Sequence, residues 1–330
     1  MRETAIAACD DGLSLVTVIT PSFNSPDILD TVRSVLEQDY PRLEYIVIDD
    51  GSESFDRKAI EEFYSGTDSR VELRIMVNEK NLGTVRTLNR AIAASSGRYI
   101  FNIAADDVYA DPSVISEWVA EFESTGAMVI TAKRDIYDPG MRVRYRTAPS
   151  GKVIRKIRES TPKELFRAMY GSNMVVGCCT AQSRACFDTY GLYDERYRII
   201  EDYPRFLRLS REGVRIHFFD RTVVKYRSGG ISSQARYNRV YEEESDSIFR
   251  NEVLEFADDK GSAESEYGAW KRRTVLRRDF MISYERAGRL GKLASLIRYG
   301  LRDPPMALQF VQERMAIRFR RRQGLMMSHK

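Results

Sequence analysis

The sequence predicts an α/β protein with a doubly wound, mostly parallel β-sheet and an α-helical C-terminal extension. Short apolar runs rich in β-branched residues, such as residues 15–20, alternate with segments such as 28–36, where apolar residues recur at helical spacing. Strands that are apolar throughout are typical of a parallel sheet covered on both faces. Strand-like runs end near residue 226, and only helical patterns follow from about Arg236.

The predicted elements alternate regularly in the first half of the chain and less regularly in the second. In the first half, strands are expected at residues 15–20, 45–48, 71–77 and 99–103, and helices from Ser25-Pro26 onward, at 55–64, from 81–84 onward and at 113–123. In the second half, we expect a strand at 128–131, a basic loop at 133–158, a helix opened by the capping box of Thr161 and Glu164, a strand at 175–179, a turn-rich segment at 187–195, a helix after Glu201-Asp202, and a short strand at 223–226.

Composition divides the chain electrostatically. The net charge of the 330 residues is +4, but residues 271–330 carry 16 Lys or Arg against 4 Asp or Glu, which leaves residues 1–270 acidic. The basic segment is therefore electrostatically distinct from the rest of the chain. The domain organisation expected is an N-terminal tail (1–13), an α/β domain (14–233, with halves 14–110 and 111–233) and a basic helical extension (234–330).

Several classes of protein are excluded by residue usage. No stretch has the roughly 20 apolar residues of a membrane helix, and the acidic N-terminus does not resemble a signal peptide. Four cysteines lack the spacing of a zinc site or a disulfide framework. With only His217 and His329 in the sequence, a His-rich metal site or a Ser-His-Asp triad is nearly excluded. The expected location is the reducing cytoplasm.

Three predicted strands end in polar residues, at 21–24 (Pro-Ser-Phe-Asn), 49–52 (Asp-Asp-Gly-Ser) and 104–107 (Ala-Ala-Asp-Asp). Right-handed crossovers bring the carboxyl ends of parallel strands to one edge of the sheet, where ligands bind. Neither a G-x-G-x-x-G fingerprint nor a Walker A motif occurs. An acidic site needs a bridging cation to hold phosphates, so the pattern points to a metal–nucleotide complex.

The order and spacing of these motifs resemble family 2 glycosyltransferases, which have the GT-A fold. The resemblance covers about residues 14–233 and rests on residues 18–24, 49–52, Asn81-Leu82-Gly83 with Asn89, 105–107, Glu201-Asp202 and Tyr226-Arg227. Each motif alone is common. Their joint occurrence in the family's order carries the assignment.

The resemblance implies a role for each matching residue. The donor nucleotide-sugar would be bound by Pro21, Phe23 and Asn24 near the base, Asp49 and Asp50 at the base and ribose, Asn81, Gly83 and Asn89 beside the nucleotide, Asp106 near the ribose, and Arg227 with the loop 229–232 closing over the donor. Mg²⁺ or Mn²⁺ would be held by Asp107, the more direct ligand, and Asp106. Asp202 corresponds to the catalytic base, with Glu201 as a neighbour that orients it or raises its pKa.

Two departures from the family pattern concern the donor side. Many members carry an aspartate where this sequence has Ala104, so the cation has one fewer potential ligand. Many also carry a histidine just after the Tyr-Arg pair, where this sequence has Ser228-Gly229. Diphosphate contacts there would come from the backbone or from Arg227.

The implied activity is metal-dependent, inverting transfer of a sugar from a nucleotide-diphosphate sugar, with a UDP- or dTDP-sugar expected first. The acceptor would be a hydroxyl group of a glycan or lipid-linked glycan, in polysaccharide or glycolipid assembly of the cell envelope. A cation neutralises the leaving diphosphate, and a carboxylate accepts the proton of the attacking hydroxyl. The alternatives are a catalytically silent nucleotide-binding module and a nucleotidyltransferase; residues 21–24 are unlike the glycine- and lysine/arginine-rich first loop of the latter.

The C-terminal extension has three interpretations. Apolar residues recur at helical spacing from Leu290, with arginines between them, and a basic run occupies 318–322. These helices could dock on the core with a solvated basic face, which is slightly favoured, or lie on an anionic membrane at the inner face of the cell membrane. Nucleic-acid binding is the weakest interpretation and is not expected, because aromatic residues are not interleaved with the basic run.

Overall fold

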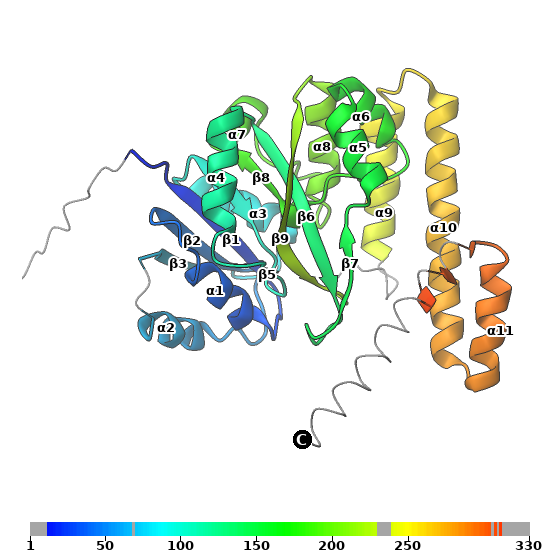
Figure 1. The fold of residues 1–330 in the computed structure, drawn as a ribbon, viewed down its shortest axis with the longest axis horizontal. Coiled ribbons are helices and arrows are strands. Elements are labelled where there is room, and N and C mark those ends of the chain that lie inside the picture. Colours follow the sequence, from blue (N-terminus) through cyan, green and yellow to red (C-terminus); the bar gives the residue numbers. More distant parts are fainter. Residues whose placement is uncertain (1–11, 68–69, 230–238, 305–306, 309, 312–330) are drawn as a thin grey trace, which may run out of the picture.

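A computed structural model describes residues 12–67, 70–229, 239–304, 307–308 and 310–311 (Figure 1). Parts of three predictions lie outside these residues: most of the N-terminal tail 1–13, the loop 229–232 beyond Gly229, and the basic run 318–322. The described chain forms one large mixed sheet with helices on both faces, and a helical hairpin at one end.

The sheet has nine strands in the order β3-β2-β1-β4-β8-β6-β9-β5, with β7 paired to β6. Their bounds are β1 Val16–Ser22, β2 Leu43–Asp49, β3 Glu72–Val77, β4 Tyr99–Asn102, β5 Val108–Tyr109, β6 Val129–Tyr137, β7 Arg144–Ala148, β8 Thr180–Ser183 and β9 Ile216–Arg227. Strands β3, β2, β1 and β4 pair in parallel, as do β6 and β9, whereas β8 is antiparallel to both β4 and β6. The predicted mostly parallel α/β sheet is therefore confirmed, with an antiparallel strand at its centre.

The helices cover both faces because neighbouring strand residues point to opposite sides. Ile46 and Ile48 of β2 belong to one buried cluster, and Tyr45 and Val47 to the other. The second cluster includes α1 (Ile28–Leu36), α2 (Arg57–Ser65) and α4 (Val114–Thr125). The first includes α3 (Thr84–Ala94), α5 (Gly151–Glu159), α6 (Pro162–Ala168), α7 (Arg184–Tyr190) and α8 (Asp202–Arg211).

The first helix begins later than predicted. The pattern Ser25-Pro26 predicted a cap followed by proline at the first helical position, but α1 begins at Ile28, with Asp27 preceding it. The Ser25 hydroxyl donates instead to the Ala105 carbonyl at 2.7 Å. A tertiary hydrogen bond has replaced the local cap, and it ties the loop after β1 to the acidic turn after β4.

Residues 133–158, predicted to be a basic loop, instead form most of β6, all of β7 and α5. Their charged side chains are compatible with strands because several form ion pairs at the sheet surface: Lys133 with Asp220 at 2.7 Å, and Arg144 with Asp135 at 3.3 Å. Strand β9 also extends well beyond the predicted residues 223–226, because it pairs with β6 along its length.

Two other local predictions were wrong. The strand expected at 175–179 is a loop ending in a 3-10 turn, Gly177–Cys179, and β8 follows it. The turn brings Gly177 so close to Glu201 that an added Cβ would lie 2.9 Å from Oε1. The turn-rich segment at 187–195 begins inside α7. By contrast, the capping box at Thr161 and Glu164 is confirmed at the start of α6.

The C-terminal helices divide into a docked part and a projecting part. Helix α9 (Arg239–Ile248) and the π-helical segment Phe249–Leu254 pack into the core beside α8, and Tyr267 of α10 stacks on Phe249 at 4.1 Å. Helix α10 (Lys260–Arg286) has Asp259 as its N-cap, whose side chain accepts from the N–H of Ser262 at 3.0 Å. Its far half forms a hairpin with α11 (Arg289–Gly300), away from the sheet (Figure 1).

Candidate active site

The carboxyl ends of β1, β2, β4 and β9 meet at one edge of the sheet, as the parallel topology requires. Phe23 and Asn24 follow β1, with 46% of the Phe23 surface exposed. Asn24 adopts a left-handed backbone (φ 49°); its N–H donates to Ser52 Oγ at 2.7 Å, and its Oδ1 accepts from the N–H of Glu53 at 3.1 Å. These bonds join the loop after β1 to the turn after β2 and leave the Phe23 ring open to solvent. Pro21 lies earlier, within β1 opposite Ile48.

Asp49 and Asp50 at the end of β2 are both buried, and protein groups occupy their oxygens. Asp49 accepts from the N–H and hydroxyl of Ser52, at 2.9 and 2.5 Å. Asp50 accepts four hydrogen bonds of 2.7 to 2.9 Å, donated by Asn78 Nδ2, Thr87 Oγ1 and the N–H groups of Leu82 and Gly83. Three of these bonds converge on Oδ1 and one on Oδ2, so Asp50 holds the turn before α3.

The turn 81–83 is also fixed by the loop that leads to Glu201. Gly83 has φ 91°, and a Cβ there would lie 2.4 Å from Arg198 Cγ. Arg198 donates to the Asn81 side chain and, at 3.1 Å, to the Asn81 carbonyl. Only glycine allows this approach. The turn 81–83 is thereby joined directly to the loop that leads to Glu201.

The Asn89 side chain is bonded within the protein. It is buried in α3; Nδ2 donates to the Tyr193 carbonyl at 2.9 Å, and Oδ1 accepts from the Tyr193 N–H at 3.0 Å. Both ends of its amide are used within the protein. Asn89 therefore anchors the 193–195 loop against α3.

The acidic turn after β4 is held from two sides. Thr31 of α1 donates to the Asp107 carbonyl at 2.6 Å, and Arg227 at the end of β9 donates its backbone N–H to Asp107 Oδ1 at 2.8 Å. Asp107 is fully buried, whereas Asp106 is half-buried. Burial and the charge of Asp106 raise the pKa of Asp107 well above its ordinary value, and burial raises that of Asp106.

These residues fit a divalent cation. Asp107 Oδ2 is buried and has no hydrogen-bond partner in the described structure. An unpaired buried carboxylate oxygen is costly, and a hard cation is the partner that removes this cost. No cluster of three or more His, Cys, Asp or Glu side chains suited to a metal exists among the described residues. This agrees with Ala104 at the position of the third aspartate, and the remaining ligands would come from a diphosphate.

Arg227 is occupied by the protein rather than open to a ligand. Its guanidinium donates to the carbonyls of Asp106 and Pro139, both at 2.9 Å, and pairs with Asp30 at 2.9 Å and Asp27 at 3.4 Å. These contacts fix the acidic turn against the start of α1.

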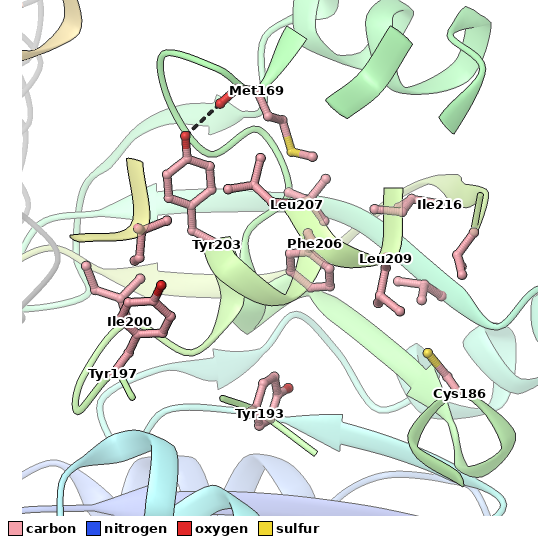
Figure 2. Close-up of a cluster of buried hydrophobic side chains, with 14 of the residues drawn as sticks. Met169, Cys186, Tyr193, Tyr197, Ile200, Tyr203, Phe206, Leu207, Leu209 and Ile216 are labelled. Atoms are coloured by element: carbon pink, nitrogen blue, oxygen red, sulfur yellow. Dashed lines mark hydrogen bonds between the residues drawn. The ribbon is translucent and has the colours of Figure 1, made fainter. Parts of the chain in front are cut away.

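The second acidic pair lies at the start of α8, and the packing of that helix positions it. Tyr203, Phe206 and Leu207 point into the buried cluster, and the Tyr203 hydroxyl donates to the Met169 carbonyl at 2.6 Å (Figure 2). On the adjacent loop, Glu244 of α9 accepts from the N–H groups of residues 198–200 at 2.6 to 3.2 Å. The loop and helix that carry the pair are thus held from opposite sides.

Glu201 and Asp202 differ in their hydrogen bonds and in how far their pKa values are raised. Asp202 accepts from the backbone N–H groups of Gly177 at 3.0 Å and Tyr203 at 2.7 Å. Burial and the neighbouring Asp202 charge raise the pKa of Glu201 to about 8. Burial also raises the pKa of Asp202, but the two N–H donors and Arg134 oppose that rise. The like-charge effect expected on Asp202 thus falls mainly on Glu201, and the two N–H donors make Asp202 the member of the pair better suited to carry the negative charge.

Sequence patterns did not identify Arg134 of β6 as a site residue. Its guanidinium lies 5.1 Å from the centre of the Tyr226 ring, and Nη1 lies 3.9 Å from the sulfur atoms of Cys178 and Cys179. Its positive charge lowers the pKa of both Asp107 and Asp202. No signal for it was present in the sequence, because Arg134 lies between Lys133 and Asp135 in a segment predicted to be a basic loop.

Comparison with known proteins identifies the family. The family model for "Glycosyl transferase family 2" matches residues 17–191, just over half of the chain. The chain belongs to this family. It is therefore a nucleotide-sugar-dependent glycosyltransferase, and its sheet and helices are those of the GT-A fold. The matched segment includes Asp106 and Asp107, whereas Asp202 and Arg227 lie beyond it.

Several known proteins resemble this glycosyltransferase. A putative teichuronic acid biosynthesis glycosyltransferase, TuaG of Bacillus subtilis, is 27% identical over 222 residues, 66% of this chain and 82% of TuaG. The Escherichia coli UDP-Glc:alpha-D-GlcNAc-diphosphoundecaprenol beta-1,3-glucosyltransferase WfgD is 35% identical over 96 residues, 29% of this chain and 36% of WfgD. The mannosyltransferase PcManGT from Pyrobaculum calidifontis, solved with GDP-Man and Mn²⁺, superposes with a TM-score of 0.60 at 16% identity, covering 92% of this chain and 86% of that one.

Contacts through Arg134 link the two predicted acidic pairs of the glycosyltransferase. The guanidinium lies over Tyr226, next to the residue that binds Asp107, and contacts Cys178, next to the residue that binds Asp202. Arg134 influences a carboxylate of each pair. Asn89 and Asp50, by contrast, are used to hold loops around the site.

None of the described helices is both long and apolar enough to cross a membrane.

Proposed function

We propose that this chain transfers a sugar, with inversion, from a nucleotide-diphosphate sugar to a hydroxyl acceptor in a metal-dependent reaction. The observation that carries the proposal is the contrast between two acidic pairs. Among the described residues Asp107 Oδ2 is buried without a hydrogen-bond partner, whereas Asp202 accepts two backbone N–H bonds beside Glu201, whose pKa is raised to about 8. Asp107 and Asp106 would hold Mg²⁺ or Mn²⁺, which supplies charge neutralisation on the diphosphate leaving group.

Asp202 would act as the base. Its carboxylate can take the proton of the attacking hydroxyl as the new glycosidic bond forms. Two backbone N–H groups fix its orientation, and the proton on Glu201 spares the site a second adjacent negative charge. Because no second carboxylate is assigned as a nucleophile, direct attack from the face opposite the diphosphate is favoured over a covalent double displacement.

The nucleotide-binding residues would divide into contacts and supports. The exposed ring of Phe23 is available to stack on the base, beside Pro21, Asn24 and Asp49. The hydrogen bonds and ion pairs that Asp50, Asn89 and Arg227 make inside the protein favour positioning roles for these residues. They would shape the turn at Asn81 and Gly83 and the turn at Asp106. A polar group with all its hydrogen bonds made inside the protein gains little by turning to a ligand.

The substrates would belong to cell-envelope glycan assembly. This rests on the names of the relatives: TuaG with teichuronic acid, and WfgD with a UDP-sugar and a diphosphoundecaprenol-linked acceptor. We propose a UDP- or dTDP-sugar as donor and a glycan or lipid-linked glycan as acceptor. PcManGT, with GDP-Man and Mn²⁺, makes GDP the first alternative nucleotide to test.

The test combines binding with turnover. Thermal stabilisation by UDP, dTDP or GDP with Mn²⁺ would select the nucleotide, and release of that nucleotide from its sugar donor would then be measured with and without EDTA. Stabilisation and EDTA-sensitive release are expected. Binding without release, with and without candidate lipid-linked acceptors, would favour the silent nucleotide-binding module, and release unaffected by EDTA would contradict the metal.

The projecting hairpin supports a second part of the proposal, contact with an anionic membrane. On α11 the side chains of Leu290, Leu293, Ile297 and Leu301 are 85, 56, 57 and 82% exposed and recur on one face. Exposed Arg298 and Arg302 lie among them, in a region of strongly positive charge. An apolar ridge flanked by arginines is typical of a helix lying in the lipid interface. The enzyme would then work in the cytoplasm, at the inner face of the cell membrane.

Vesicle co-sedimentation tests this surface. The full chain should bind phosphatidylglycerol vesicles more strongly than phosphatidylcholine vesicles, and replacing the four α11 residues by serine should abolish the difference. Leu192→Ser, at a leucine 40% exposed on the catalytic domain, is the matched control. Equal sedimentation of the quadruple variant and the control would overturn the membrane contact.

A further inference from the structure

Arg134 is a half-buried cation, and no carboxylate of the described residues forms an ion pair with it. Its Nε is buried and has no hydrogen-bond partner within the described residues. Its neighbours are two sulfur atoms, which are weak acceptors, and the Tyr226 ring. A guanidinium has five N–H donors, and leaving them unmatched in a buried place is costly. Such a group is suited to an anionic ligand.

The strand is irregular where it presents this side chain. The pairing of β6 with β9 shifts register on both sides of Lys133, and regular pairing resumes with Arg134 opposite Val224. Bulges of this kind re-aim a side chain and are common beside active sites. The neighbouring Lys133 pairs at the surface with Asp220, whereas the Arg134 guanidinium lies beside Cys178, Cys179 and the Tyr226 ring.

Arg134 lies where the two halves of the site meet. On the donor side it lies over the ring of Tyr226, whose neighbour Arg227 donates its N–H to Asp107. On the acceptor side it contacts Cys178, whose neighbour Gly177 donates its N–H to Asp202. The bond between the sugar and the diphosphate must lie between Asp107 and Asp202 if the proposed function holds. A positive charge there faces the oxygen that gains negative charge as that bond breaks.

The other arginines around the site are committed to the protein. Arg227 holds two carbonyls and two aspartates, and Arg198 holds Asn81. The site also has Ala104 where an additional aspartate would add a metal ligand. With fewer carboxylate ligands, the cation would bind this site less tightly. A fixed guanidinium would supply additional positive charge.

We propose that Arg134 binds the β-phosphate of the nucleotide-diphosphate donor. The inference rests on the proposed function. In the transfer, the bond between the sugar's anomeric carbon and the β-phosphate oxygen breaks, and its electron pair stays on that oxygen. The acceptor oxygen bonds to the carbon, and its proton passes to Asp202. Arg134 donates hydrogen bonds to the β-phosphate, both before and after it leaves.

The experiment compares nucleotides that differ only in the β-phosphate. Calorimetry would measure UDP and UMP binding, with Mg²⁺ and with EDTA, to the full chain and to Arg134→Gln, Arg134→Lys and Arg144→Gln; if the native chain prefers GDP or dTDP, that diphosphate and its monophosphate are used. The control Arg144 lies on the adjacent β7 and pairs at the surface with Asp135. Arg134→Gln should weaken diphosphate binding about 10- to 100-fold and leave monophosphate binding unchanged. Arg134→Lys should recover part of the loss, and Arg144→Gln should match the native chain.

The outcomes separate this inference from the function beneath it. If no nucleoside diphosphate binds the native chain, the proposed function fails. If the native chain binds and Arg134→Gln keeps the native ratio of diphosphate to monophosphate affinity, the Arg134 inference alone is overturned. A purely structural role predicts that result, with both affinities and the melting temperature falling together. A changed ratio with an unchanged melting temperature supports direct contact.

Discussion

The two acidic pairs of this glycosyltransferase lie in the same site but are held differently. Asp106 and Asp107 lie on a turn whose backbone and one carboxylate oxygen are fixed by Thr31 and Arg227, leaving the other Asp107 oxygen buried and unpaired. Glu201 and Asp202 start a helix, where backbone N–H groups hold Asp202 and the raised pKa of Glu201 keeps a proton on the pair. The first arrangement is suited to accept a cation and the second to accept one proton. Adjacent like charges thus have opposite uses, depending on which partners the fold supplies.

The largest expected effect comes from removing the proton acceptor. Asp202→Asn keeps the size of the side chain but cannot take a proton, so kcat should fall by about 10²- to 10⁴-fold with nucleotide affinity unchanged. Steady-state transfer kinetics and calorimetry measure the two quantities. The control is Glu212→Gln, at the exposed end of the same helix, where the carboxylate only pairs with Arg208. A turnover rate within a few fold of the native rate would remove Asp202 from the role of base.

Neutralising the other pair should act on metal dependence rather than on the proton. Asp107→Asn removes the buried negative charge, so the gain in nucleotide-diphosphate affinity produced by Mn²⁺ should be lost, while metal-free binding persists. Calorimetry with Mn²⁺ and with EDTA makes the comparison. Because the unpaired charge is costly in the native protein, the melting temperature should not fall. A variant that keeps the native response to Mn²⁺ would contradict the assignment of Asp107 as ligand.

The comparison also separates what local sequence can encode from what it cannot. The strands that precede Asn24, Asp50 and Asp107 were predictable because each is a short apolar run followed by turn-forming residues. Parallel topology then places their ends together without further information. The sequence therefore predicted which loops meet at this edge of the sheet, whereas the part each of their residues plays in binding the donor stays a prediction.

The acceptor half depends on contacts between distant residues. Glu244 holds the loop before Glu201 from more than 40 positions away, and Gly83 is required by Arg198, far along the chain. Arg134 was missed because its strand gains order from pairing with β9 rather than from its own charged sequence. Tertiary pairing overrides local propensity in such strands.

The smallest expected effect on activity comes from Glu201, and it concerns pH. Glu201→Gln mimics the protonated side chain, so turnover near pH 7 should stay within a few fold of native, in contrast to Asp202→Asn. Stability should respond more. The pKa of Glu201 is raised from 4.5 to about 8 on folding, so between these values the native protein holds a proton that the unfolded chain has released. Its contribution to stability therefore declines as pH rises through this window and levels off above about 8.

Glutamine cannot ionise, so the variant should lose this decline. The slope that arises from the raised pKa of Asp202 should remain in both proteins. Melting temperatures measured from pH 5 to 9 for the native chain, Glu201→Gln and the exposed control Glu212→Gln would show whether the slope flattens in Glu201→Gln alone. An unchanged slope would mean that Glu201 is ionised in the native protein at neutral pH. Glu201 and Asp202 would then carry two charges, and the pair would resemble the cation-accepting turn at Asp107 rather than contrast with it.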